Sequence, residues 1–209
     1  MGASYTTIAR MRAEIDKLSA ADDATIQFII DAASATIDRV CNRPEGFVAL
    51  ALAAARIYPG NGDDWQYIDE CVDVTLVRVK ESATDTYTTW LATDYLKCTG
   101  DRRYPDFNSL PYTALLIDPN GDYALWYKDG NYPTVEITAK WGFAVVTPPD
   151  IEQATIITVA RAFKRGQSGW SDVLASGELG MLLYRAAMDP EVKNILIQGR
   201  YVKPVVGRR

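Results

Sequence analysis

The chain has 209 residues with 48% hydrophobic and 23% charged residues and a formal net charge of −5. This length suits one domain, or one domain with an insertion, and it is enough to bury a proper core. No apolar run approaches the roughly 18–20 residues of a membrane span, which argues against a membrane protein. The amino-terminal sequence MGASYTTIAR lacks a signal-peptide pattern, so we expect a protein that stays in a cytoplasm.

Histidine is absent from the sequence, and the three cysteines, Cys41, Cys71 and Cys98, lie far apart. Histidine is the usual general base and the commonest metal ligand, so its absence excludes Ser-His and Cys-His catalysis and disfavours zinc or iron sites. No C-x-x-C spacing supports a disulfide framework or a thiolate zinc site. We therefore expect no metal and no cofactor. Carboxylate-based or lysine-based chemistry is the remaining catalytic option.

The charge is divided unevenly along the chain. From Asp150 onward there are nine basic and six acidic residues, whereas the preceding residues contain thirteen basic and 21 acidic ones. Because affinity for the DNA backbone comes from Lys and Arg, the acidic body argues against tight nonspecific DNA binding. A basic carboxyl-terminal end favours docking on an acidic partner.

The first 46 residues are predicted to form helices. A threonine at position 6 or 7 caps a short helix through Lys17, and Ser19-Ala-Ala-Asp22 resembles a capping box that begins a second helix. Apolar residues recur there at spacings of three and four: Ile26, Ile29, Ile30, Ala33, Ile37, Val40 and Cys41. This periodicity predicts an amphipathic helix that ends at Pro44.

Residues 47–147 are predicted to form an antiparallel β element that is inserted into the helical body. Strands are expected near residues 47–57, 71–80, 87–91, 114–117, 123–127 and 135–141, with a loop over residues 97–111. The first of these runs is alanine-rich and its composition also allows a helix. A strand is preferred because the run leads into the turn cluster YPGNGD. The last strand alternates apolar and polar residues, which is typical of a half-buried strand.

Helix is predicted again from Asp150 to about Lys164. This helix is apolar over so much of its circumference that it is either deeply buried or packed against another subunit. A looser helical segment is expected over residues 179–188. Asp189-Pro190-Glu191 then begins a final short helix that Gly199 ends. Residues 148–199 would complete the helical body, and residues 200–209 would form an extended arm, giving an α+β fold.

Five short motifs follow one another in a fixed order between about residues 22 and 201. They are the stretch AASATIDRVCNR at 32–43, RIYPG at 56–60, TDYL at 93–96, the joint from Trp141-Gly142 to Pro149-Asp150, and DPEV at 189–192 with Arg200-Tyr201. In this order they resemble the head–tail connector (adaptor) proteins of tailed phages. The alanine run after Phe47 and the stretch Gly166–Gly180 depart from that pattern.

The resemblance implies a structural virion protein with no enzymatic activity. In that family the subunits assemble in the host cytoplasm and form a ring, typically of twelve copies, beneath the portal in the phage neck. The ring extends the DNA channel and links head to tail. The implied partners are further copies of the chain, the portal protein and the next neck or tail protein. Genome DNA would pass through the lumen without sequence-specific binding.

Three sets of residues are predicted to serve this assembly. The portal-docking arm combines basic, aromatic and aliphatic residues: Arg200, Tyr201, Val202, Lys203, Val205, Arg208 and Arg209. The candidate inter-subunit contacts are Ile151, Phe163, Trp65 and Trp170. The candidate neck-facing or lumen acidic loops contain Asp63, Asp64, Asp118 and Asp122.

Two other classes of function stay open on the sequence alone. A carboxylate-dependent hydrolase acting on carbohydrate or phosphate requires two acids that converge in a pocket, and Asp63 and Asp122 are its candidates. A monomeric binding module requires the apolar helix to be buried internally. Asp118-x-Asn120-x-Asp122 is half of a calcium loop, but Tyr123 stands where that loop needs glycine, which favours a hairpin turn.

Overall fold

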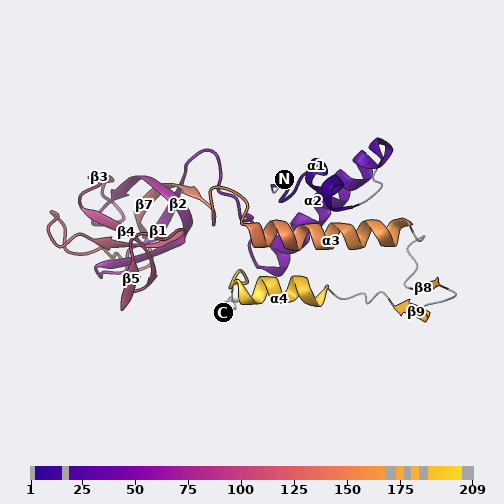
Figure 1. Cartoon of the computed structure of the whole chain (residues 1–209). Helices are drawn as coiled ribbons and strands as arrows, with labels where there is room; N and C mark the ends of the chain where they lie inside the picture. Colours follow the sequence, from indigo (N-terminus) through magenta and orange to yellow (C-terminus); the bar gives the residue numbers. More distant parts are fainter. Residues whose placement is uncertain (1–2, 16–18, 168–172, 177–179, 184–187, 204–209) are drawn as a thin grey trace. The chain divides into compact units, whose positions relative to one another are not determined.

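The computed structural model describes residues 3–15, 19–167, 173–176, 180–183 and 188–203. The contacts divide the chain into two compact units (Figure 1). The first, which we call the helical unit, combines residues 1–47 with residues 147–209. The second, the β unit, comprises residues 48–146. Helices and a largely antiparallel sheet thus occur in one chain, and the predicted α+β class with an inserted β element is confirmed.

The helical unit contains four α-helices and one 3-10 helix among its described residues. Their bounds are α1 Ile8–Glu14, η1 Ala20–Asp22, α2 Asp23–Val40, α3 Pro149–Gln167 and α4 Pro190–Gln198. Thr7 caps α1 by accepting a hydrogen bond from the backbone N–H of Arg10 at 3.1 Å. Asp189 caps α4 by accepting from the N–H of Glu191 at 2.8 Å. Both helix starts were expected because caps are local signals.

The core of the helical unit lies where α1, α2 and α3 meet. Met11 of α1, Ile26 and Ile30 of α2, and Val159 and Phe163 of α3 are all buried in one cluster. The apolar residues of α2 recur at spacings of three and four, so they line the single face that this cluster covers. The predicted amphipathic helix is therefore confirmed, and it packs against the broad apolar helix α3.

The β unit is a seven-stranded sheet. Its strands are β1 Ala54–Pro59, β2 Trp65–Val79, β3 Thr88–Trp90, β4 Tyr95–Asp101, β5 Tyr104–Asp106, β6 Tyr112–Ile117 and β7 Pro133–Trp141. The order is β1-β7-β2-β6-β4-β5, all pairs are antiparallel, and β3 pairs with β2. Strand β7 buries alternate residues, with Val135, Ile137, Ala139 and Trp141 in the core, as the alternation predicts.

Three expectations for the β unit were wrong. Residues 47–53 precede β1 rather than forming its first half. The expected loop over 97–111 contains the β4–β5 hairpin, whose turn is closed by the carboxylate of Asp101 accepting from the N–H groups of Arg103 and Tyr104. Residues 123–127 form no strand, because Trp126 is bonded to the turn just before β2 instead: its backbone N–H donates to the carbonyl of Asp63 at 2.9 Å.

A short hairpin replaces part of the helix expected over residues 179–188. Strands β8 Val173–Ser176 and β9 Gly180–Leu183 pair antiparallel, with Leu174 opposite Leu182. A short apolar run suits a helix or a strand equally, and only the partner strand decides between them. The helix prediction is therefore wrong over residues 180–183. Within the described residues, no helix is long and apolar enough to cross a membrane.

Candidate interaction sites

The acidic loops of the β unit meet at the carboxyl-terminal end of strand β6. The backbone N–H of Ile117, at the end of β6, donates to the carbonyl of Asp64 at 2.9 Å, just before β2 begins. The predicted acids Asp63, Asp64 and Asp118 therefore lie close to one another. Asp118 forms a turn, since its side chain accepts from the N–H of Asn120 at 2.8 Å. Asp122 follows on the same loop and is exposed.

Arg102 neutralises part of this acidic group, a pairing that no sequence pattern indicates. Its guanidinium lies 2.5 Å from a carboxylate oxygen of Asp63 and 2.7 Å from one of Asp64. The β4–β5 hairpin carries Arg102 to a partner 39 residues away in the chain. The pKa of Asp63 is lowered, first by a hydrogen bond from the N–H of Asp64 and then by the hydrogen bond from Arg102.

These contacts weaken the two catalytic or metal-binding interpretations of the acids. A carboxylate with a lowered pKa is a poor proton acceptor, so Asp63 does not suit a general base. Asp129, the twelfth position of the half calcium loop, accepts from the N–H of Ala83 at 2.8 Å. Among the residues that the structure describes, no group of three or more carboxylate or thiol side chains is placed to hold a metal ion.

The first residues of the predicted portal-docking arm pack on the helical unit itself. The carbonyl of Tyr201 accepts from the guanidinium of Arg43 at 2.9 Å, and the N–H of Lys203 donates to the carbonyl of Cys41 at 3.0 Å. The Tyr201 ring meets Phe47 edge-on at 5.6 Å. Residues 200–203 are thus anchored. Val205, Arg208 and Arg209 lie outside the described residues.

The candidate inter-subunit contacts are mostly core residues of the single chain, which corrects the expectation that they face a neighbour. Ile151 and Phe163 are buried in the helical unit, and Trp65 is buried in the β unit. Trp170 lies outside the described residues. The apolar surface of α3 is broad, as predicted, but most of it packs against α1, α2 and α4. Exposed apolar side chains occur elsewhere, including Phe28 on α2.

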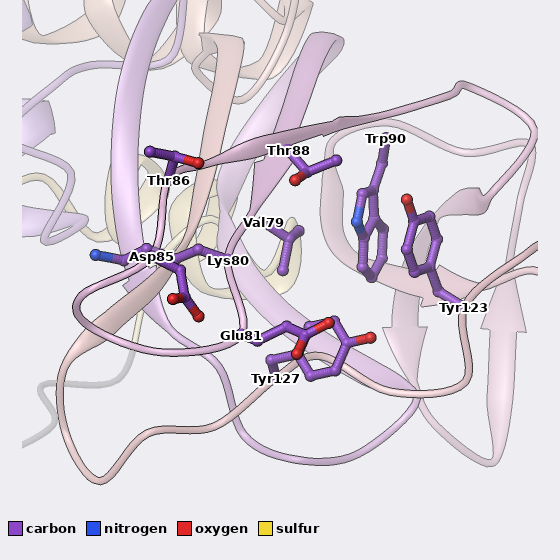
Figure 2. Close-up of a pocket in the computed structure, with 9 residues that line it drawn as sticks. All are labelled: Val79, Lys80, Glu81, Asp85, Thr86, Thr88, Trp90, Tyr123 and Tyr127. Carbon is purple, nitrogen blue, oxygen red and sulfur yellow. The ribbon is translucent and has the colours of Figure 1, made fainter.

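One open hollow of about 520 Å³ lies in the β unit beside strand β3 (Figure 2). Its lining side chains are Val79, Lys80, Glu81, Asp85, Thr86, Thr88, Trp90, Tyr123 and Tyr127. None of the acids predicted from the sequence lines it. Trp90 stacks on Tyr123 at 4.0 Å and on Trp126 at 4.7 Å, so its faces are covered by other rings. The hollow therefore offers no free indole face on which a base or sugar could stack.

The whole chain was compared with known proteins. No family model and no curated protein matches it. A chain in the neck of the empty GTA particle computed with C6 symmetry is similar, with a TM-score of 0.53 and 20% identity over 98% of this chain and 94% of that one. Chains in the neck of the native GTA particle computed with C12 symmetry and in the virion of the native gene transfer agent particle have TM-scores of 0.49 and 0.48 at 19% and 20% identity. They cover 97% and 98% of this chain, and 92% and 94% of their own. The chain therefore has the fold of a chain from the neck of a gene transfer agent (GTA) particle, in agreement with its resemblance to head–tail connector proteins.

Proposed function

We propose that this chain is a structural subunit of the neck of a tailed phage or phage-like particle. In this role it forms a ring beneath the portal, extends the DNA channel and links head to tail, and it performs no catalysis. One observation carries the proposal: the fold similarity to a neck chain extends over 98% of this chain and 94% of that one. The similarity therefore includes both the helical unit and the β unit.

The symmetry of the similar particle supports the proposed ring. That neck was computed with C6 symmetry, and the twelve copies expected from the family resemblance are a multiple of six. A closed ring repeats one heterologous contact, so each subunit presents two different complementary faces to its neighbours. The partners in this proposal are further copies of the chain, the portal protein and the next neck or tail protein.

The acidic surface of the β unit suits a position near passing DNA or a neighbouring neck protein. Asp118 and Asp122 lie on the same exposed loop, next to the Asp63–Asp64 pair. Carboxylates do not neutralise phosphates, so such a surface lets DNA slide without retaining it. We assign these loops to the lumen or to the neck-facing end of the ring, in a virion protein assembled in the host cytoplasm.

The basic end of the chain is the proposed portal-docking segment. Tyr201 and Lys203 are fixed to the helical unit, so the chain continues toward Arg208 and Arg209 from a defined point.

Truncation after Lys203 keeps this anchor and removes the last six residues. We expect the truncated chain to lose portal binding in a pull-down while its thermal unfolding midpoint stays unchanged. Replacing Arg208 and Arg209 with Glu should have the same effect, and replacing both with Lys should preserve binding. Undiminished binding by the truncated chain would remove the docking role from this segment alone.

The proposal as a whole is tested by mass measurement in solution together with negative-stain imaging, with and without portal protein. Rings, alone or on the portal, are the expected result. The main competing function is a monomeric binding module, which the burial of Ile151 and Phe163 inside the chain favours. A rigid monomer that does not bind the portal protein would support that alternative and contradict the proposed ring.

A further inference from the structure

An aromatic side chain protrudes from the outer face of α2. Phe28 is 74% exposed, although Ile26 and Ile30 on the same helix are fully buried. Each residue of an α-helix is rotated by about 100° from the last, so Phe28 points about 200° away from both isoleucines. The neighbouring positions on its face are the exposed Ala24 and Ala32, four residues away, and the exposed Thr25 and Asp31, three residues away. The ring therefore stands above a surface of small side chains.

A hollow of about 530 Å³ lies on a different face of the same helical unit. Its lining residues are Glu14 of α1, Gln153, Ile156, Ile157, Ala160, Arg161 and Lys164 of α3, and Asp189. The lining combines the apolar side chains of Ile156, Ile157 and Ala160 with four charged residues. The pair formed by Arg161 and Asp189, 3.2 Å apart, stands beside them. Apolar residues next to charged ones are found where the apolar core of a protein interface meets its polar rim.

We propose that Phe28 of one copy inserts into this hollow on α3 of the next copy, and that this contact closes the ring. The inference rests on the proposed ring function and names the two faces that the ring requires. A subunit cannot fill its own hollow, because α2 packs on α3 through Ile26 and Ile30 while Phe28 points away. A knob and a hollow on separate faces of one chain make a heterologous contact, which is the kind that generates rings.

The charges beside the knob and the hollow are complementary. Asp31 is exposed one turn after Phe28, and within the described residues its carboxylate accepts from neutral donors alone, Ser4 at 2.7 Å and Gln27 at 2.9 Å. Lys164 is exposed one turn after Ala160, and it forms no ion pair with the part of the chain that the structure describes. One helical turn is about 5.4 Å. In the proposed contact the two helices run parallel, so that with the Phe28 ring against Ala160 the carboxylate of Asp31 comes within reach of the Lys164 ammonium.

The first test measures assembly of the full-length chain by mass photometry, with portal protein present if assembly requires it. Phe28→Ala should raise the subunit concentration needed for ring assembly at least 100-fold. Its thermal midpoint should not change, since the side chain is exposed in the single chain. Tyr104→Ala is the matched control, because Tyr104 is an aromatic residue with 80% exposure in the β unit. We expect Tyr104→Ala to assemble as the unmodified chain does.

Charge exchange tests the register of the contact. Asp31→Lys and Lys164→Asp should each weaken assembly at least tenfold, and the double variant should recover it, because every copy carries both faces. Mixing two variants tests whether the contact runs head to tail. Phe28→Ala retains only the hollow, whereas Ala160→Trp fills the hollow and retains only the protruding Phe28. Each should be monomeric alone, and the mixture should stop at heterodimers.

The outcomes separate this inference from the proposed function. Rings of the unmodified chain together with normal rings of Phe28→Ala would overturn the Phe28 contact and leave the neck function standing. An unmodified chain that stays monomeric even with portal protein would overturn both. A third outcome is that Phe28→Ala loses the rings while the double variant Asp31→Lys with Lys164→Asp fails to recover assembly. This would support the Phe28 contact and reject the Asp31–Lys164 register.

Discussion

The hydroxyl of Tyr5 donates a hydrogen bond to the carboxylate of Asp38, 33 residues further along the chain. The same hydroxyl accepts from the backbone N–H of Phe47 at 2.8 Å. Three segments of the helical unit are thereby joined at one buried oxygen atom. Gly46 makes room for it: its φ is +82°, and a Cβ there would lie only 2.7 Å from the Tyr5 hydroxyl.

Tyr5→Phe should lower the free energy of unfolding by about 1–3 kcal/mol, because it removes the hydrogen bonds that the hydroxyl makes with a buried carboxylate and with a backbone N–H. Urea denaturation followed by circular dichroism measures this change. Tyr104→Phe is the control, since Tyr104 is largely exposed, and it should change stability by less than about 0.5 kcal/mol. Equal stability of Tyr5→Phe and the unmodified chain would show that the hydrogen bonds contribute nothing net.

Asp38 should make the stability of the helical unit depend on pH. Burial raises the pKa of Asp38 above its ordinary value of 3.8, although the hydrogen bond from Tyr5 acts in the opposite direction. Between the ordinary and the raised pKa the unfolded chain releases a proton that the folded chain retains. The contribution of Asp38 to stability is therefore present below the ordinary pKa and is lost as the pH rises through the folded value.

Asp38→Asn removes this titration and serves as the reference. The free energy of unfolding of the unmodified chain minus that of Asp38→Asn should fall as the pH rises from about 3.5, and it should level off above the raised pKa. Urea denaturation at a series of pH values provides the measurement. A difference that grows with pH would mean that the folded pKa of Asp38 is depressed instead.

In the acidic group of the β unit, the pKa of Asp63 is shifted in the opposite direction to that of Asp38. The pKa of Asp63 is lowered by the N–H of Asp64 and by Arg102, so Arg102→Gln should raise it only part of the way to the ordinary value. Carbon-detected NMR titration of the Asp63 carboxyl measures this shift. Arg103→Gln, one residue away, is the matched control and should leave the titration unchanged. An identical Asp63 titration in Arg102→Gln would show that the ion pair does not form in solution.

The anchor of the carboxyl-terminal segment should appear as a contribution to stability. Tyr201→Ala removes the contact with Phe47 and the hydrogen bond from the Tyr201 hydroxyl to Asp150 at 3.1 Å. It should therefore cost about 1–3 kcal/mol. Val202→Ala, at a 40% exposed position, should cost less than about 0.5 kcal/mol. Differential scanning calorimetry would contradict this view of the segment if truncation after Gly199 melted at the same temperature as truncation after Lys203.

Local signals in the sequence predicted several elements correctly. The cap at Thr7, the Ser19–Asp22 capping box and the Asp189-Pro190 start each satisfy backbone groups within three residues. The alternation in β7 and the three-to-four spacing in α2 report which face is buried, so these elements were found as well. Residues 123–127 and 180–183 were misread because their partners lie on other segments, and no local period records a partner.

The amino-acid sequence alone determined the helix caps, the amphipathic faces, the α+β class and the absence of histidine chemistry, because each depends on neighbouring residues or on composition. Only the tertiary structure decided that Arg102 pairs with Asp63 and Asp64 and that Tyr201 packs on the helical unit. It also decided that most of the apolar surface of α3 is buried inside the chain. Which side chains remain exposed after folding is a property of the packing between distant segments. For that reason the exposure of Phe28, on which the proposed assembly contact rests, is evident from the structure and not from the sequence.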